Sequence, residues 1–285
     1  MHKLLIVLLL STTYIFSHIN AVVSIVPEQT FLKAIGGEKV NITLMVQAGD
    51  SPHSYEPKPS QMLMVAKADL YLAIGVEFEE VWLPKFQSLN SKMHVADISK
   101  GVKKIAILHD AHTSHAADDI DEHKGLDPHI WTSPANVKTI ARNIYKALLS
   151  VDKQNEAYYR HNLHAFLQQV EKTDMQIKKS LSKLKGSRTF MVFHPSWGYF
   201  AKAYGLKEIA VEVEGKNPKP RELVALMKEA KEERVTAIFT QPEMSDTSAK
   251  ILAKELHIPV VKITPLAPNW SQNLINIAKA IAGER

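Results

Sequence analysis

Short apolar runs alternate with longer segments of helical periodicity along nearly the whole chain after residue 21. The apolar runs predict strands at Val22–Val26, Val40–Val46, Leu70–Ile74, Met93–Ile98, Thr189–Phe193, Glu208–Val213, Ala237–Thr240 and Val260–Ile263. The segments between them predict helices at Glu28–Ile35, Ser60–Ala66, Ser133 to about Ser150, Tyr199–Tyr204, Arg221–Glu232, Asp246–Leu256 and from Ser271 onward. Alternating strands and helices are typical of β/α units around mostly parallel sheets, so we expect an α/β protein.

One segment is helical over an unusual length. No proline or glycine occurs from Lys153 to Lys185, and apolar residues recur there at helical spacing. Such a helix would span about 45–50 Å at 1.5 Å per residue, which exceeds what one small domain needs. We therefore expect a linking helix at 153–185 between an N-terminal lobe at 22–152 and a C-terminal lobe at 186–285.

The first residues have the layout of a secretory signal peptide. A positive start at Met1-His2-Lys3 precedes the apolar run Leu4–Phe16, and small and polar residues follow up to Ala21. This layout predicts a signal peptide at 1–21 with cleavage after Ala21, and an uncleaved membrane anchor is the alternative. We expect a soluble mature protein in the periplasm, where disulfides are possible but not required.

The amino-acid composition restricts the kinds of functional site that the chain can form. The 285 residues include 35 Lys+Arg and 30 Asp+Glu, and this mildly basic balance without a clustered patch argues little for nucleic acid. The absence of cysteine excludes thiol catalysis, disulfides, cysteine-type zinc sites and lipid attachment through a cysteine. The 13 histidines are the opposite extreme, and the candidate chemistry depends on where they lie.

Three histidines lie where predicted strands end or helices begin. His53 follows the second strand, His129 precedes a helix, and His194 follows the first strand of the second lobe; each adjoins a proline. Loops at the carboxyl ends of strands in open α/β sheets face a common crevice. Imidazole is a common ligand of divalent metals, and three nitrogens leave a fourth position open. The spacing alone leaves a shared metal site and ordinary hydrogen-bonding histidines about equally supported.

The motifs around these histidines resemble the periplasmic metal-binding proteins of zinc and manganese ABC transporters. The resemblance rests on Gly49–Ser60 within 22–86, on Asp127-Pro128-His129-Ile130-Trp131, on Phe193-His194-Pro195 and on Tyr204-Gly205-Leu206. It extends over essentially the whole mature chain in order. It implies two β/α lobes bridged by a rigid helix, with a metal cleft between the lobes. It also implies a monomeric, non-enzymatic receptor that delivers Zn²⁺ to a membrane permease with a cytoplasmic ATPase.

The resemblance also implies a ligand set. His53, His129 and His194 match the first three metal positions of the family. Manganese-binding relatives commonly have Glu where His194 stands, so an all-nitrogen set favours zinc. The fourth family position is an Asp, which this chain replaces by Thr264, so water is the first candidate there and Glu243 a weaker one.

Acidic neighbours are expected to compensate for the missing carboxylate. Our hypothesis is that Asp127 or Glu56 accepts the free imidazole N–H of a ligand. At 109–123, four further histidines lie among five acids, which predicts an auxiliary, weaker zinc-gathering loop or else a polar insertion that binds metal incidentally. These histidines are His109, His112, His115 and His123.

Two function classes compete with a zinc receptor. Three histidines with a water also describe the site of a zinc hydrolase, but no His-Glu-x-x-His segment is present. A surface adhesin or structural protein that uses metal for stability is the second alternative. Within the transport class, a receptor for Mn²⁺ or Fe²⁺ remains open.

Overall fold

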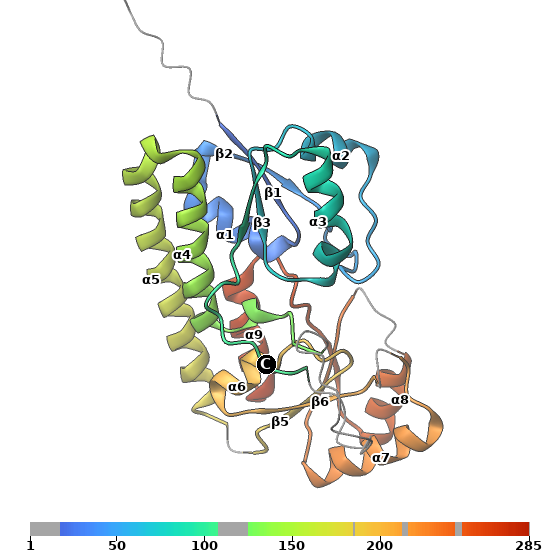
Figure 1. Cartoon of the computed structure of the whole chain (residues 1–285). Coiled ribbons are helices and arrows are strands. Elements are labelled where there is room, and N and C mark those ends of the chain that lie inside the picture. The colour runs from blue at the N-terminus through green and yellow to red at the C-terminus, as the bar shows by residue number, and fades with distance from the viewer. Residues whose placement is uncertain (1–17, 108–124, 185, 213–215, 243–246, 285) are drawn as a thin grey trace, which may run out of the picture.

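The chain forms two parallel sheets joined by a long helical hairpin (Figure 1). The computed structural model describes residues 18–107, 125–184, 186–212, 216–242 and 247–284. The strands are β1 Ile19–Val23, β2 Val40–Leu44, β3 Leu70–Ala73, β4 His94–Asp97, β5 Thr189–Val192, β6 Lys207–Ala210, β7 Ile238–Thr240 and β8 Val260–Lys262. The α-helices are α1 Val26–Gly36, α2 Pro59–Val65, α3 Glu77–Leu89, α4 Pro134–Val151, α5 Glu156–Leu181, α6 Gly198–Tyr204, α7 Pro220–Glu232, α8 Thr247–Leu256 and α9 Trp270–Ile281. The expected α/β class with two lobes is confirmed.

The two lobes have the same strand order. The N-terminal sheet runs β2-β1-β3-β4 and the C-terminal sheet runs β6-β5-β7-β8, and every pairing is parallel. In each sheet the first strand lies between the second and the third, so the chain reverses its direction of travel at that point. Such a switch point opens a crevice beyond the carboxyl ends of the two central strands.

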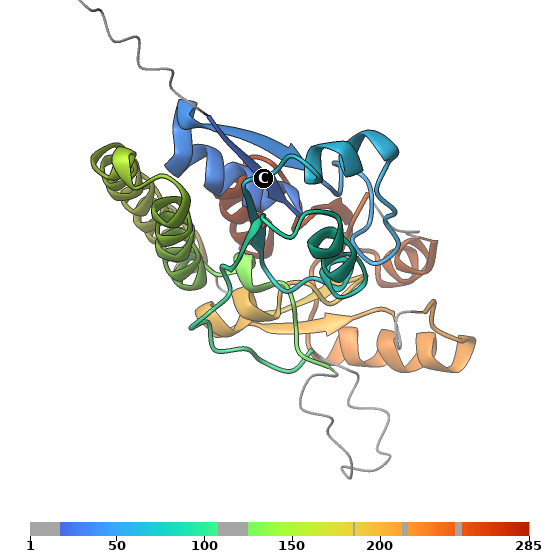
Figure 2. The ribbon, with the colours of Figure 1, turned by 45° about the horizontal axis from the view of Figure 1, so that its top comes forward.

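The linking helix is shorter than the sequence predicts. A 3₁₀ turn at Lys153–Asn155 comes first, and α5 then continues for 26 residues, which corresponds to about 39 Å. Its apolar face is buried at Leu163, Phe166, Val170 and Ile177. Figures 1 and 2 show α4 and α5 side by side along the N-terminal lobe, and α5 alone continues to the C-terminal lobe, where it packs against α9, so one long helix bridges the lobes as expected.

The last helix, α9, packs against elements of both lobes. α9 packs along α5, and the Trp270 ring meets Phe31 of α1 edge-on at 5.5 Å between centroids. One hydrophobic core accordingly includes residues from both sheets, among them Val22 and Phe190. A separate, smaller core lies between the C-terminal sheet and helices α7 and α8. The boundaries of the lobes as separate domains stay a prediction.

The first strand starts earlier than expected, at Ile19 instead of Val22. Pro27 in the first turn of α1 fixes a helical φ there, and the Glu28 carboxylate accepts the backbone N–H of Ser24 and of Ile25. The apolar residue Val26 therefore belongs to the helix. The predicted cleavage site after Ala21 lies inside β1, whereas residues 1–17 lie outside the described part of the chain.

Helix α3 was not expected from the sequence. Pro84 lies inside it, and proline usually marks the end of a helix. Phe78 and Phe86 anchor the helix in the core despite that residue. Of the helices in the described ranges, none is both long and apolar enough to cross a bilayer.

Candidate metal centre

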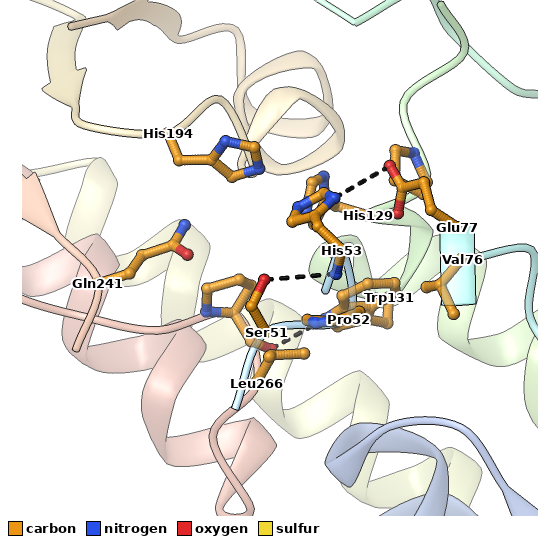
Figure 3. Close-up of a pocket in the computed structure, with 12 residues that line it drawn as sticks. Ser51, Pro52, His53, Val76, Glu77, His129, Trp131, His194, Gln241 and Leu266 are labelled. Atoms are coloured by element: carbon orange, nitrogen blue, oxygen red, sulfur yellow. Dashed lines mark hydrogen bonds and ion pairs between the residues drawn. The ribbon is translucent and has the colours of Figure 1, made fainter. Parts of the chain in front are cut away.

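A small pocket lies between the lobes, where the loops beyond the strands of both sheets meet. It is lined by Ser51, Pro52, His53, Val76, Glu77, Pro128, His129, Trp131, His194, Gln241, Pro265 and Leu266 (Figure 3). These residues follow β2, β3, β5, β7 and β8, or lie in the segment that leads into α4. The cavity measures about 20 Å³, which is room for one water molecule or one small ion.

The structure brings the three predicted histidines together in this pocket. The His194 ring lies 5.3 Å from the His53 ring and 5.4 Å from the His129 ring, measured between centroids. Rings bound to one tetrahedral zinc ion, with each nitrogen about 2 Å from the metal, have centroids roughly 5 Å apart. However, no three His, Asp or Glu side chains in the described ranges already form a group that could hold a metal ion.

Each of the three histidines has a carboxylate at its Nδ1 atom. The distance is 2.8 Å from His129 to Asp127 Oδ1 and 2.6 Å from His194 to Glu212 Oε1. At His53 the partner is Glu77 Oε1, at a longer 3.5 Å. Because Nδ1 is used in this way, Nε2 is the donor atom that each ring keeps for a ligand.

Asp127 thus contacts a histidine as we hypothesised, whereas Glu56 is exposed and does not line the pocket. Sequence reasoning missed Glu77 and Glu212. Glu212 could have been identified from the sequence, because it is a charged residue within the apolar run of a predicted strand. Its backbone N–H bonds the Phe193 carbonyl, which brings it beside His194.

The environment shifts the protonation of these groups. Burial lowers the pKa of His194, against the opposing effect of Glu212. Its Nε2 atom is buried with no hydrogen-bond partner, which is the arrangement expected of a donor awaiting a ligand. The hydrogen bond to Glu77 raises the pKa of His53. Although burial opposes ionisation of Glu77, its contacts with His53 outweigh burial and lower its pKa to about 2.

Thr264, the predicted fourth position, is not among the residues that line the cavity. Thr264 Oγ1 accepts the backbone N–H of Leu266 at 3.0 Å, and its carbonyl oxygen accepts the Asn273 side chain at 2.8 Å. The next two residues, Pro265 and Leu266, line the pocket in its place. Glu243 and the histidine-rich stretch at 109–123 lie outside the described residues.

Hydrogen bonds between the lobes surround the pocket. The indole N–H of Trp131 donates to the Pro265 carbonyl, and that of Trp270 donates to the Trp131 carbonyl, both at 2.8 Å. The Tyr199 hydroxyl donates to the Asp127 carbonyl at 2.9 Å. A side chain at Gly198 would approach Asp127 Oδ2 to 2.8 Å, so a larger residue there would displace the Asp127 carboxylate.

Two parallel-sheet lobes, a helical connection and a histidine-lined pocket between facing strand ends define a metal-binding receptor of the bilobed substrate-binding class. The comparisons with known proteins agree. The profile of the family described as "Zinc-uptake complex component A periplasmic" matches residues 21–283, so the chain belongs to this ZnuA family.

Individual relatives divide by metal. The high-affinity zinc uptake system protein ZnuA of Bacillus subtilis is 26% identical over 242 residues, covering 84% of this chain and 75% of the relative. The manganese ABC transporter substrate-binding lipoprotein PsaA of Streptococcus pneumoniae is 26% identical over 237 residues, covering 80% and 73%. A ZnuA crystal structure has a TM-score of 0.85 at 37% identity and covers 94% of this chain and 99% of that one.

The comparisons establish the general activity. The chain is a metal-binding receptor of an ABC transporter, and receptors of this family are transport proteins rather than enzymes. The zinc hydrolase alternative is therefore wrong. Which metal the chain carries is not decided, because relatives named for zinc and for manganese match about equally well.

Proposed function

We propose that this protein is a periplasmic Zn²⁺ receptor that delivers zinc, as a monomer, to the permease of an ABC importer powered by a cytoplasmic ATPase. The single observation that carries the choice of zinc is the set of three imidazole rings around one small cavity. Nitrogen donors suit zinc, whereas manganese prefers oxygen. The buried Nε2 of His194, central between the other two rings, supports a nitrogen ligand at the heart of the site.

Capture of zinc requires a small rearrangement. His129 and His194 are almost fully buried and held by short contacts to Asp127 and Glu212. The His53 side chain is 37% exposed and has the longer contact. We infer that zinc first meets the two fixed histidines and that His53 then turns to complete the ligand set.

Calorimetry on protein purified without an affinity tag tests this function. We expect one tight zinc ion per chain, and we expect His129→Ala to weaken zinc binding by at least a hundredfold, since the neighbouring Asp127 would lose its partner as well. His161→Ala is the matched control, because His161 is exposed on α5 far along the chain from the pocket loops. Unchanged zinc affinity in the His129 variant would exclude the pocket as the zinc site.

A manganese receptor is the second candidate, and the Glu77 carboxylate in the pocket favours it. The relative named as a manganese lipoprotein adds support. Competition between Zn²⁺ and Mn²⁺ for the wild-type protein separates the two. Displacement of bound zinc by equimolar manganese would reverse our assignment.

A further inference from the structure

We propose that Glu77 is a direct ligand of the captured metal and the residue that sets how well the site accepts manganese relative to zinc. The proposal rests on the proposed function, since it needs the three histidines to bind the metal. It adds an oxygen donor from α3, an element that supplies none of the histidines.

The position of Glu77 is the first argument. Among the described residues that line the cavity, it is the one carboxylate. Asp127 and Glu212 contact the Nδ1 atoms of the histidines but do not line the cavity, so they orient the rings and do not reach the metal position. Figure 3 shows the Glu77 side chain beside the His53 and His129 rings, on the side of the pocket opposite Gln241.

The freedom of Glu77 is the second argument. The side chains of Asp127 and Glu212 are 3% and 6% exposed and lie within 2.8 Å of their histidines. Glu77 is 44% exposed, and its contact with His53 is 3.5 Å long. A partner that orients a ring is held tightly, as the first two are. A side chain that must turn toward an arriving ion needs the looser placement that Glu77 has.

The third argument is the chemistry of the remaining donors. Three neutral imidazoles leave zinc one ligand short of four and leave the full double charge in place. The other polar side chains that line the cavity, Gln241 and Ser51, are neutral and cannot offset this charge. Both also make hydrogen bonds within the protein: the Gln241 amide nitrogen donates to the Ser196 hydroxyl, and Ser51 Oγ accepts the backbone N–H of His53. A carboxylate from Glu77 would complete the tetrahedron and halve the net charge of the site. Its oxygen also favours manganese more than a fourth nitrogen would.

Glu77→Gln tests the proposal against Glu80→Gln as the matched control. Glu80 lies one turn further along the same helix and is exposed, so both variants remove one negative charge from the first turn of α3. We expect Glu77→Gln to weaken zinc binding by about tenfold to a hundredfold and manganese binding by a larger factor. Glu80→Gln should leave both unchanged. Equal losses in the two variants would mean a general effect of charge and would overturn the proposal.

A double-mutant cycle separates a direct ligand from a residue that positions His53. In protein that already carries His53→Ala, a ligand at Glu77 still contacts the metal, so Glu77→Gln should still weaken binding. If Glu77 acts only through His53, the second substitution will have no effect, and the proposal fails. Failure of the proposed function looks different, because His129→Ala would then leave zinc affinity unchanged whatever Glu77 does.

Discussion

Glu208 is a buried acid behind the metal pocket. It accepts the backbone N–H groups of Ser196 and Trp197, the segment that follows His194. Burial raises its pKa to about 8; the hydrogen bond from Trp197 opposes the shift, and the nearby Asp127 carboxylate adds to it. At neutral pH this acid is therefore mostly protonated.

The raised pKa gives a prediction about stability. Below about pH 4.5 both the folded and the unfolded chain hold the proton, and ionisation costs nothing. Between pH 4.5 and about 8 the unfolded chain releases it while the folded chain keeps it, so this group lowers stability by up to about 1.4 kcal/mol per pH unit. Glu208→Gln keeps an acceptor oxygen and removes the titration. We expect the variant to gain a few kcal/mol relative to wild type between pH 5 and pH 8.

Urea unfolding of metal-free protein at several pH values in that range measures the effect. Chelator keeps metal binding out of the comparison, so the two proteins differ in one titrating group. Parallel pH profiles for wild type and variant would show that Glu208 is ionised in the folded chain, contrary to this account.

At the residue scale, the sequence identifies pocket residues that have a recognisable local motif. It misses residues that reach the pocket only through the pairing of strands or through a helix that was not predicted. His53, His129 and His194 could be identified because each adjoins a strand end or a helix start and a proline. Glu212 lies beside His194 because β6 pairs with β5, and Glu77 enters the pocket at the start of an unpredicted helix. Neither neighbour follows from spacing along the chain.

At the element scale, β1 gives a prediction about the start of the mature chain. Ile19 pairs with Val40 and Ala21 pairs with both Ile42 and Leu70, and both side chains are buried. A chain that begins at Val22 loses these pairings and this apolar burial, at a cost of about 3 kcal/mol or more. We expect it to melt several degrees below a chain that begins at Ile19.

Thermal unfolding of the two truncated chains checks this expectation, and mass spectrometry of the protein purified from cells that express the full chain shows which form exists. We expect cleavage before Ile19, which would leave β1 whole. A mature chain that starts at Val22 and melts no lower than the longer one would mean that the first three residues of β1 contribute nothing.

Most elements follow from local pattern, and the errors at α1 and α3 have identifiable causes. The predicted strand up to Val26 is interrupted only by Ser24, so the apolar pattern cannot show that a helix begins within it, at Val26. α3 tolerates Pro84 because Phe78 and Phe86 are buried in the core, a tertiary effect that a local rule does not include. α5 ends at Leu181 although helix-forming residues continue beyond it.

At the scale of the whole molecule, the connections between lobes determine how far they can move. α5 extends along both lobes, and α9 packs against it from the C-terminal side. Hydrogen bonds also link the lobes, from Trp131 to Pro265, from Trp270 to Trp131 and from Thr30 to Pro268. Wide hinge closure would break these bonds and open the shared core, whereas a turn of His53 or Glu77 breaks none of them.

We therefore expect zinc binding to leave the overall shape nearly unchanged. Small-angle scattering should show a change below about 0.5 Å in a radius of gyration of roughly 18 Å. Trp270→Phe keeps an aromatic ring against Phe31 but removes the bond to the Trp131 carbonyl. If the bonds between lobes limit the motion, the variant should compact more than wild type on adding zinc. A large compaction of the wild-type protein would instead mean that these bonds break and re-form as the metal enters, and that the lobes move as hinged bodies.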